Sequence, residues 1–122
     1  MSDITELVTT YLAAWNETDP AVRQARIAEV MTEDVEYTDP LVSVEGRDGL
    51  DAAMAAVQGQ FEGLQFSLAG PIDAHHSLAR FTWHLGRPGA KPVAVGFDVA
   101  VIGDDGRISQ VLGFLDEVPS GA

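Results

Sequence analysis

The spacing of apolar residues changes between the two halves of this chain, and this change limits the possible folds more than any other feature. After residue 64 apolar residues recur at every second position, the period of a β-strand. Before that point they recur at steps of three and four, the period of one helix face, as in Ile4, Leu7, Val8, Tyr11, Leu12 and Trp15. Helices followed by strands predict an α+β domain with the helices on one face of an antiparallel sheet.

Three helices are expected. The first ends within "NETDP", because the residue before Pro20 disfavours helical dihedral angles. Asp19 is the predicted N-cap of a second helix with Pro20 at its first position, and Ile27, Val30 and Met31 are expected on its buried side. Two short extended segments follow, at residues 35–39 and 42–45. Asp48 is the predicted N-cap of a third helix, whose apolar face contains Leu50, Ala53, Met54, Val57 and Phe61.

Four strands are expected in the second half, in "LQFSLAGPI", "LARFTWHLG", "KPVAVGFDVAVIG" and "RISQVLGFLDEV". They are separated by turn sequences such as "GRPGAKP" and "GDDGR", and the latter contains an Asp-Gly pair typical of hairpins. The length of 122 residues suits one domain with one core, so we expect residues 1–122 to form a single domain.

Composition excludes several kinds of chemistry and partner. The chain contains no cysteine, which removes disulfides, thiol nucleophiles and cysteine-ligated zinc. Its net charge of −12 disfavours binding to nucleic acid or anionic lipid. No apolar run approaches a membrane span, and "MSDITELV" does not resemble a signal peptide. We therefore expect a cytoplasmic protein with neither nucleic acid nor membrane as its partner, and no spacing of residues indicates a metal site.

Asp98 lies within a strongly apolar strand. Val93, Val95, Phe97, Val99 and Val101 share one face, and Asp98 shares the other with small residues. Both faces are mainly apolar, which predicts a strand buried on both sides. Burial would favour the neutral carboxyl at Asp98, which then donates a hydrogen bond. The alternative, equally open from the sequence, is that Asp98 faces solvent at a sheet edge or caps a turn.

Asp39, Tyr11 and Gly113 each have a structural and a functional interpretation. Aspartate before proline commonly starts a turn, as Asp39 does in "TDP". Tyr11 lies in the apolar stripe of the first helix, where its hydroxyl needs a hydrogen-bond partner; the helix alone favours an ordinary core tyrosine. Gly113 weakens a strand unless another group approaches closely, and it also fits a bulge.

Three segments carry a resemblance to a known family: "TTYLAAWNETDP", "VEYTDPLVSVEGRDGLDAAM" and "VGFDVAVIGDDGRI". The chain resembles the nuclear transport factor 2-like superfamily and, within it, SnoaL-like proteins and ketosteroid isomerases, over nearly its whole length. The resemblance implies a cone-shaped antiparallel sheet, strongly curved around three N-terminal helices as a cystatin-like α+β barrel, with an apolar pocket. It also implies a homodimer formed through the sheet, for which Val93, Val95, Val99 and Val101 offer an apolar face.

The isomerase resemblance implies roles for three residues and no cofactor. Tyr11 in "YLAAWN" and Asp98 in "VGFDVAV" match the family's two donors to an enolate oxygen, with Asp98 protonated. Asp39 in "TDP" matches the base that moves a proton next to the carbonyl of a small apolar substrate. The residues predicted to line the substrate pocket are Trp15, Phe61, Trp83, Val111 and Leu115.

Two other functions stay open from the sequence. One is a non-catalytic protein that binds a small molecule in the same pocket. The other is an epoxide hydrolase-like or cyclase-like enzyme, in which Arg80 and Asp98 activate water. In "LARFTWHLG" Ala79, Phe81, Trp83 and Leu85 share one face, while Arg80, Thr82 and His84 share the other. If the second face looks inward, the pocket is too polar for a steroid. His75 and His76 are expected to cap a turn, and Arg47 to lie on the surface.

Overall fold

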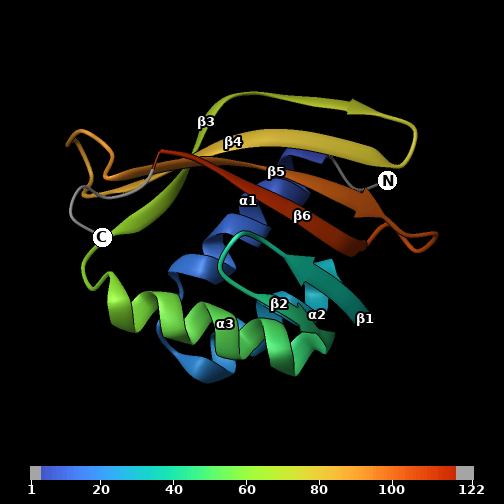
Figure 1. Cartoon of the computed structure of the whole chain (residues 1–122). Coiled ribbons are helices and arrows are strands. Elements are labelled where there is room, and N and C mark those ends of the chain that lie inside the picture. The colour runs from blue at the N-terminus through green and yellow to red at the C-terminus, as the bar shows by residue number, and fades with distance from the viewer. Residues whose placement is uncertain (1–3, 118–122) are drawn as a thin grey trace.

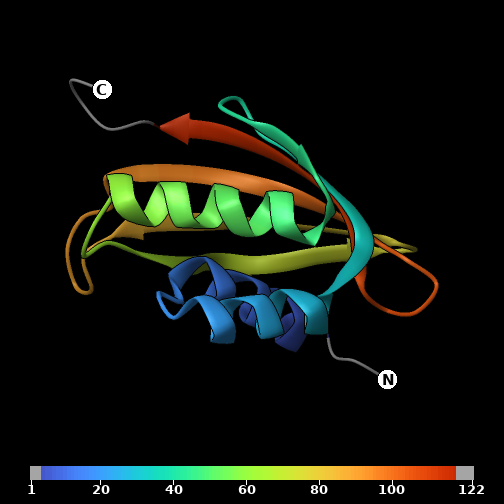
Figure 2. The same ribbon diagram turned by 90° about the horizontal axis from the view of Figure 1, so that it is seen from below.

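The helices of this protein cover one side of a six-stranded sheet. We describe a computed structural model, in which residues 4–117 are described. The elements in chain order are α1 (Ile4–Asn16), α2 (Pro20–Val30), β1 (Met31–Thr38), β2 (Ser43–Glu45), α3 (Gly46–Gln60), β3 (Gln65–His75), β4 (Leu78–Gly86), β5 (Ala94–Ile102) and β6 (Ile108–Glu117). Figures 1 and 2 show all three helices against the same side of the curved sheet. No helix in residues 4–117 has the length and apolar character needed to cross a membrane.

The sheet is mixed and does not close into a barrel. Its strand order is β2-β1-β6-β5-β4-β3, and β3 to β6 form the expected antiparallel series. The expectation of a wholly antiparallel sheet is wrong at one pair, because β1 runs parallel to β6. Hairpin turns indicate only neighbours that are close in the chain. The pairing of β1 with β6 joins segments about 75 residues apart and has no such local signal.

Local capping chemistry explains α2. The Oδ1 atom of Asp19 accepts hydrogen bonds from the amides of Ala21 and Val22, with Pro20 in the first turn, as predicted. Met31 is buried as expected, but it begins β1 instead of ending the helix.

The start of α3 differs from the prediction. It begins at Gly46, with Glu45 as its N-cap, so Asp48 lies in the first turn and does not cap the helix. Gly46 has a φ of 82°, a conformation that glycine adopts without steric cost, and this lets the chain enter the helix three residues early. The negative charge of Asp48 still stabilises the N-terminal end of α3, because it interacts favourably with the helix dipole.

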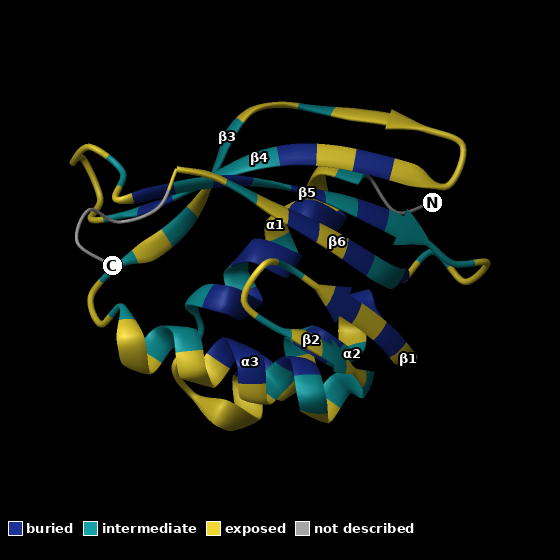
Figure 3. Ribbon diagram, in the orientation of Figure 1, coloured by how far each residue is buried: buried dark blue, intermediate teal, exposed yellow. Residues whose placement is uncertain are grey.

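The core lies between the helices and the concave face of the sheet. Figure 3 shows buried and exposed residues alternating along β4 and β6, so one face of each strand meets the helices. On β5 the face with Ala94, Asp98 and Ala100 is buried, whereas the valine face is only half-buried. The expectation that β5 is buried on both sides is therefore wrong for the single chain, because every helix packs on the concave side.

Candidate functional site

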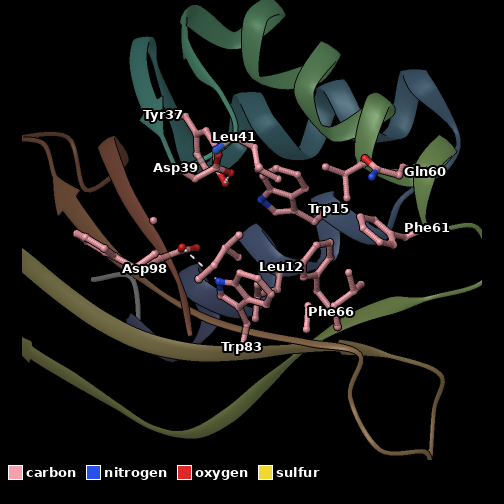
Figure 4. Close-up of a pocket in the computed structure, with 16 residues that line it drawn as sticks. Leu12, Trp15, Tyr37, Asp39, Leu41, Gln60, Phe61, Phe66, Trp83 and Asp98 are labelled. Atoms are coloured by element: carbon pink, nitrogen blue, oxygen red, sulfur yellow. Dashed lines mark hydrogen bonds between the residues drawn. The ribbon is translucent and has the colours of Figure 1, made fainter. Parts of the chain in front are cut away.

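A cavity of about 320 Å³ lies between the helices and the concave face of the sheet. Its walls are mainly aromatic and aliphatic side chains, and its two acidic groups are Asp39 and Asp98. Figure 4 shows both carboxyl groups at the same end of the cavity, with the Trp15 and Trp83 rings beside them. The volume is at the lower end of the range for small-molecule sites.

The residues predicted to line a pocket have different positions. Trp15, Phe61, Trp83 and Leu115 line the cavity, whereas Val111 is fully buried in the hydrophobic core and does not. Val111 shares its strand face with Leu115, but it lies four residues closer to the start of β6. Alternation along a strand predicts the face of a residue and not its position along the cavity.

Asp39 follows β1 directly, and its carboxylate accepts three hydrogen bonds. Its Oδ1 atom accepts from the backbone amides of Leu41 at 2.8 Å and Val42 at 2.9 Å, forming the turn that "TDP" predicts. The hydroxyl of Tyr37 donates to Oδ2 at 2.6 Å. A carboxylate has about four acceptor positions, so three of them are used and one remains on Oδ2.

Tyr37 is a site residue that the sequence analysis missed. It is buried, lines the cavity and lies two residues before Asp39. Burial raises its pKa well above the ordinary value, and the neighbouring Tyr11, Asp98 and Asp39 raise it further. Its phenol therefore stays protonated and remains a donor to Asp39. The signal for Tyr37 was its spacing, since residues two apart in a strand share a face.

Asp98 lies on the concave face of β5 and is only 4% exposed. The indole Nε1–H of Trp83 donates to its Oδ1 atom at 3.2 Å. Burial raises the pKa of Asp98 to about 7, because desolvation disfavours the charged form; the Trp83 hydrogen bond opposes this shift and the charge of Asp39 adds to it. The interpretation of Asp98 as a solvent-facing edge residue is therefore excluded.

Gly113 allows Asp39 and Asp98 to approach each other. It pairs with Asp98 in the β5–β6 register. A Cβ atom at position 113 would lie 2.9 Å from Oδ1 of Asp98 and 3.2 Å from Cβ of Asp39. Both residues thus lie against the same glycine, and any side chain there would push them apart. The sequence interpretation of close approach at Gly113 is confirmed.

Tyr11 adjoins the cavity but does not line it. Its ring is fully buried and makes edge contacts with Trp15 and Phe81. Its hydroxyl has no hydrogen-bond partner within residues 4–117. Burial raises the pKa of Tyr11 well above the ordinary value and the charge of Asp98 adds to this rise; Trp15 opposes it, and the charge of Asp39 adds a smaller part. Tyr11 therefore meets the cavity through its contact with Trp15, which lines it.

The remaining polar candidates lie elsewhere. Arg80 is exposed on the convex face of β4 and pairs with Asp73 at 3.1 Å, so it does not meet Asp98. His84 shares that convex face, and His75 and His76 lie at the turn between β3 and β4. The inward face of β4 is the apolar one, with Phe81, Trp83 and Leu85.

Arg47 donates to the carbonyl of Met31 at 2.8 Å. Residues 4–117 contain no cluster of three or more His, Cys, Asp or Glu suited to a metal ion.

Three helices on a curved, unclosed mixed sheet with a cavity between them define an α+β protein of the nuclear transport factor 2-like fold. A family model described as the SnoaL-like domain matches residues 8–111. The chain therefore belongs to the SnoaL-like family. No curated protein showed significant similarity to it.

Solved structures agree with this membership. A candidate isomerase of the SnoaL-like family from Agrobacterium tumefaciens str. C58 is 41% identical, with a TM-score of 0.87, over 92% of this chain and 96% of that chain. TsrD from Streptomyces laurentii is 22% identical, with a TM-score of 0.73, over 95% and 92%. A candidate SnoaL-like polyketide cyclase from Jannaschia sp. CCS1 is 20% identical, with a TM-score of 0.69, over 95% and 90%. The last two support the fold alone.

Proposed function

We propose that this protein is a cofactor-independent, isomerase-type enzyme that moves a proton next to the carbonyl group of a small apolar molecule. The observation that carries the proposal is the pair of aspartates that lie against Gly113 at one end of an apolar cavity. Their environments differ: Asp39 accepts three hydrogen bonds, whereas Asp98 is buried with a pKa raised to about 7. Two acids in unlike environments suit a base and a proton donor.

In the proposed reaction Asp39 takes a proton from the carbon next to the substrate carbonyl, using the free acceptor position on Oδ2. The electron pair of that C–H bond moves into the enolate, and the negative charge develops on its oxygen. Neutral Asp98 donates a hydrogen bond to this oxygen, and preplaced donors of this kind lower the barrier. Asp39 then returns the proton to another carbon of the same substrate, which completes an isomerisation.

Tyr11 is the proposed second donor to the enolate oxygen. Its buried hydroxyl lacks a partner in residues 4–117, and an unpaired buried donor is costly. A substrate oxygen near Asp98 would relieve this cost if the cavity adjusts to admit it. The candidate isomerase of the same family, 41% identical, supports an isomerase class for this chain.

A non-catalytic binding protein is the second candidate, and one observation favours it. The Oδ1 atom of Asp39 is fully used by the turn amides of Leu41 and Val42. This is the arrangement of a structural turn residue, and Asp39 would then contribute only a polar contact to a bound molecule. The two functions differ in what replacement of Asp39 does to proton exchange.

Asp39→Asn tests the proposal. An asparagine retains an Oδ1 for the two amides, so the turn and the fold are expected to persist. Exchange of the hydrogens next to the carbonyl of cyclohex-3-enone and related neutral ketones, followed by NMR in D₂O, should fall about 10²–10⁴-fold. Asp34→Asn, an exposed aspartate on β1, is the matched control and should retain the wild-type rate.

Two outcomes would contradict the proposed function. One is an unchanged exchange rate in Asp39→Asn. The other is a wild-type protein that binds neutral ketones but exchanges none of their hydrogens, which is the result for a binding protein.

A further inference from the structure

The packing of the Trp83 indole beside Asp98 is a feature that the proposed reaction does not use. Trp83 pairs with Gly96 in the β4–β5 register, and Asp98 is two residues farther along β5 on the same face. A Cβ atom at Gly96 would lie 2.3 Å from Cζ2 and 2.8 Å from Cε2 of Trp83. The indole therefore lies over the bare backbone of Gly96. Any residue other than glycine at position 96 would place a Cβ atom in the space that the indole occupies.

A second contact holds the Trp83 ring from β3, the strand that pairs with the other edge of β4. Phe66 on β3 meets Trp83 edge-on, with ring centroids 5.2 Å apart and an angle of 76°. The glycine beneath and the phenylalanine beside the indole restrict its orientation. Its Nε1–H consequently points at Oδ1 of Asp98, as the dashed line in Figure 4 shows.

The chemistry of this contact distinguishes the two oxygens of Asp98. An indole N–H can donate a hydrogen bond but cannot accept one. Oδ1 must therefore be the acceptor, in both the neutral and the charged form of the carboxyl. In the neutral acid the carbonyl oxygen is the better acceptor, so this contact favours the form with the proton on Oδ2.

We propose that Trp83 is a positioning residue that orients the Asp98 carboxyl, assigns its acid proton to Oδ2, and so sets which oxygen donates to a ligand. The last part of this inference rests on the proposed function, whereas the orientation of Asp98 does not. Trp83 acts through Asp98. Its indole holds the Asp98 carboxyl by a hydrogen bond and also forms part of the cavity wall.

Other groups that face Asp98 must be considered in any titration. Asp39 lies across Gly113, and its charge opposes ionisation of Asp98. Tyr11 on α1 and Tyr37 on β1 have pKa values raised well above the ordinary value by burial, so both stay neutral while Asp98 titrates. The indole hydrogen bond of Trp83 favours the charged form of Asp98, and its removal should raise the pKa of that carboxyl.

The test removes the N–H without changing the shape of the ring. The chain contains two tryptophans, so in a Trp15→Phe background Trp83 is the only tryptophan that remains. In that background the Trp83 indole is replaced by the isosteric benzothiophene ring of benzothienylalanine, and Trp83 with its natural indole is the matched control. Carboxyl ¹³C NMR without substrate should show the pKa of Asp98 rise by about one pH unit. An unchanged or lower pKa would overturn the proposal.

A second measurement uses the wild-type chain and does not depend on the folding of a variant. The indole N–H resonance of Trp83 should shift with the same midpoint as the Asp98 carboxyl, whereas that of Trp15 should not follow it. A Trp83 resonance that ignores this midpoint would overturn the inference. Both readouts are independent of turnover, so a failure of the proposed reaction in Asp39→Asn leaves them interpretable.

Discussion

At the scale of single residues, the properties of this site come from what surrounds each aspartate. Asp39 and Asp98 are the same side chain, yet one is held by turn amides and a phenol, and the other is enclosed by apolar walls and an indole. Desolvation raises the pKa of Asp98, because it penalises the charged form of a carboxyl where water is excluded. Gly113 and Gly96 contribute by their lack of a side chain, which lets Asp39 approach Asp98 and lets Trp83 lie over β5.

Asp98→Asn should change how stability depends on pH. The pKa of Asp98 is about 7 in the folded protein against an ordinary 3.8, so the folded state binds this proton more tightly. Its stabilising contribution is fully present below the unfolded pKa and is lost as pH rises through about 7. From about pH 5 to about pH 8.5, wild type should lose about 2–3 kcal/mol relative to Asp98→Asn in urea unfolding. Parallel pH curves for the two proteins would contradict this expectation, and Asp34→Asn, which is exposed, should track wild type.

At the scale of elements, a buried arginine joins the three helices. Arg23 on α2 donates to Asp51 on α3 at 2.6 Å, to Gln58 on α3 at 3.1 Å and to the carbonyl of Glu17 at 3.2 Å. Gln58 in turn donates to the carbonyl of Trp15 at 2.8 Å. This network fixes the end of α1 that places Trp15 in the cavity wall.

Asp51→Asn should destabilise the protein by about 2–3 kcal/mol, because it leaves the buried Arg23 charge without its partner. The matched control is Asp73→Asn, which breaks the Arg80–Asp73 pair on the convex surface, where both side chains are 64% exposed. Exposed pairs contribute little, so the control should cost less than about 1 kcal/mol. Equal losses in the two variants, measured by urea unfolding, would refute a structural role for the Arg23 network.

The elements also show how far local patterns reach. The Asp19–Pro20 start of α2 and the four strands from β3 to β6 were predicted, because caps, turns and alternation act within a few residues. The start of α3 was predicted three residues late, because Asp48 resembles a cap while Gly46 begins the helix. Trp83 was predicted on one face of β4, but which face looks inward depends on the helices that pack there.

At the scale of the whole molecule, the convex side of the sheet carries many apolar side chains that the helices do not cover. Half-exposed or exposed side chains on β5, β6 and the segment before β5 form it: Val93, Val95, Phe97, Val99, Val101, Leu112 and Phe114. Phe97 and Phe114 stack on this side at 5.0 Å. Apolar sheet faces of this kind commonly mark protein interfaces. We propose that two copies of the chain pair through this convex face.

Val99→Glu should disrupt that dimer, because it places a charge in the middle of the convex face. Light scattering coupled to size exclusion should give twice the 13.0 kDa chain mass for wild type and a single chain mass for the variant. Val22→Glu, on an exposed valine of α2 away from the sheet, is the control and should stay dimeric. A monomeric wild-type protein would refute the proposed pairing.

The sequence by itself determined the order of helices and strands and the class of fold, and it named Asp39 and Asp98 as candidate acids, because these depend on local periodicity, turn chemistry and short motifs. Only the tertiary structure decided that the acids meet. Thr38 pairs with Leu112 across the parallel β1–β6 contact, and Asp98 pairs with Gly113 across β5–β6. Asp39, the next residue after Thr38, is thereby brought to Gly113. That convergence depends on pairing between segments far apart in the chain, and no local pattern encodes it.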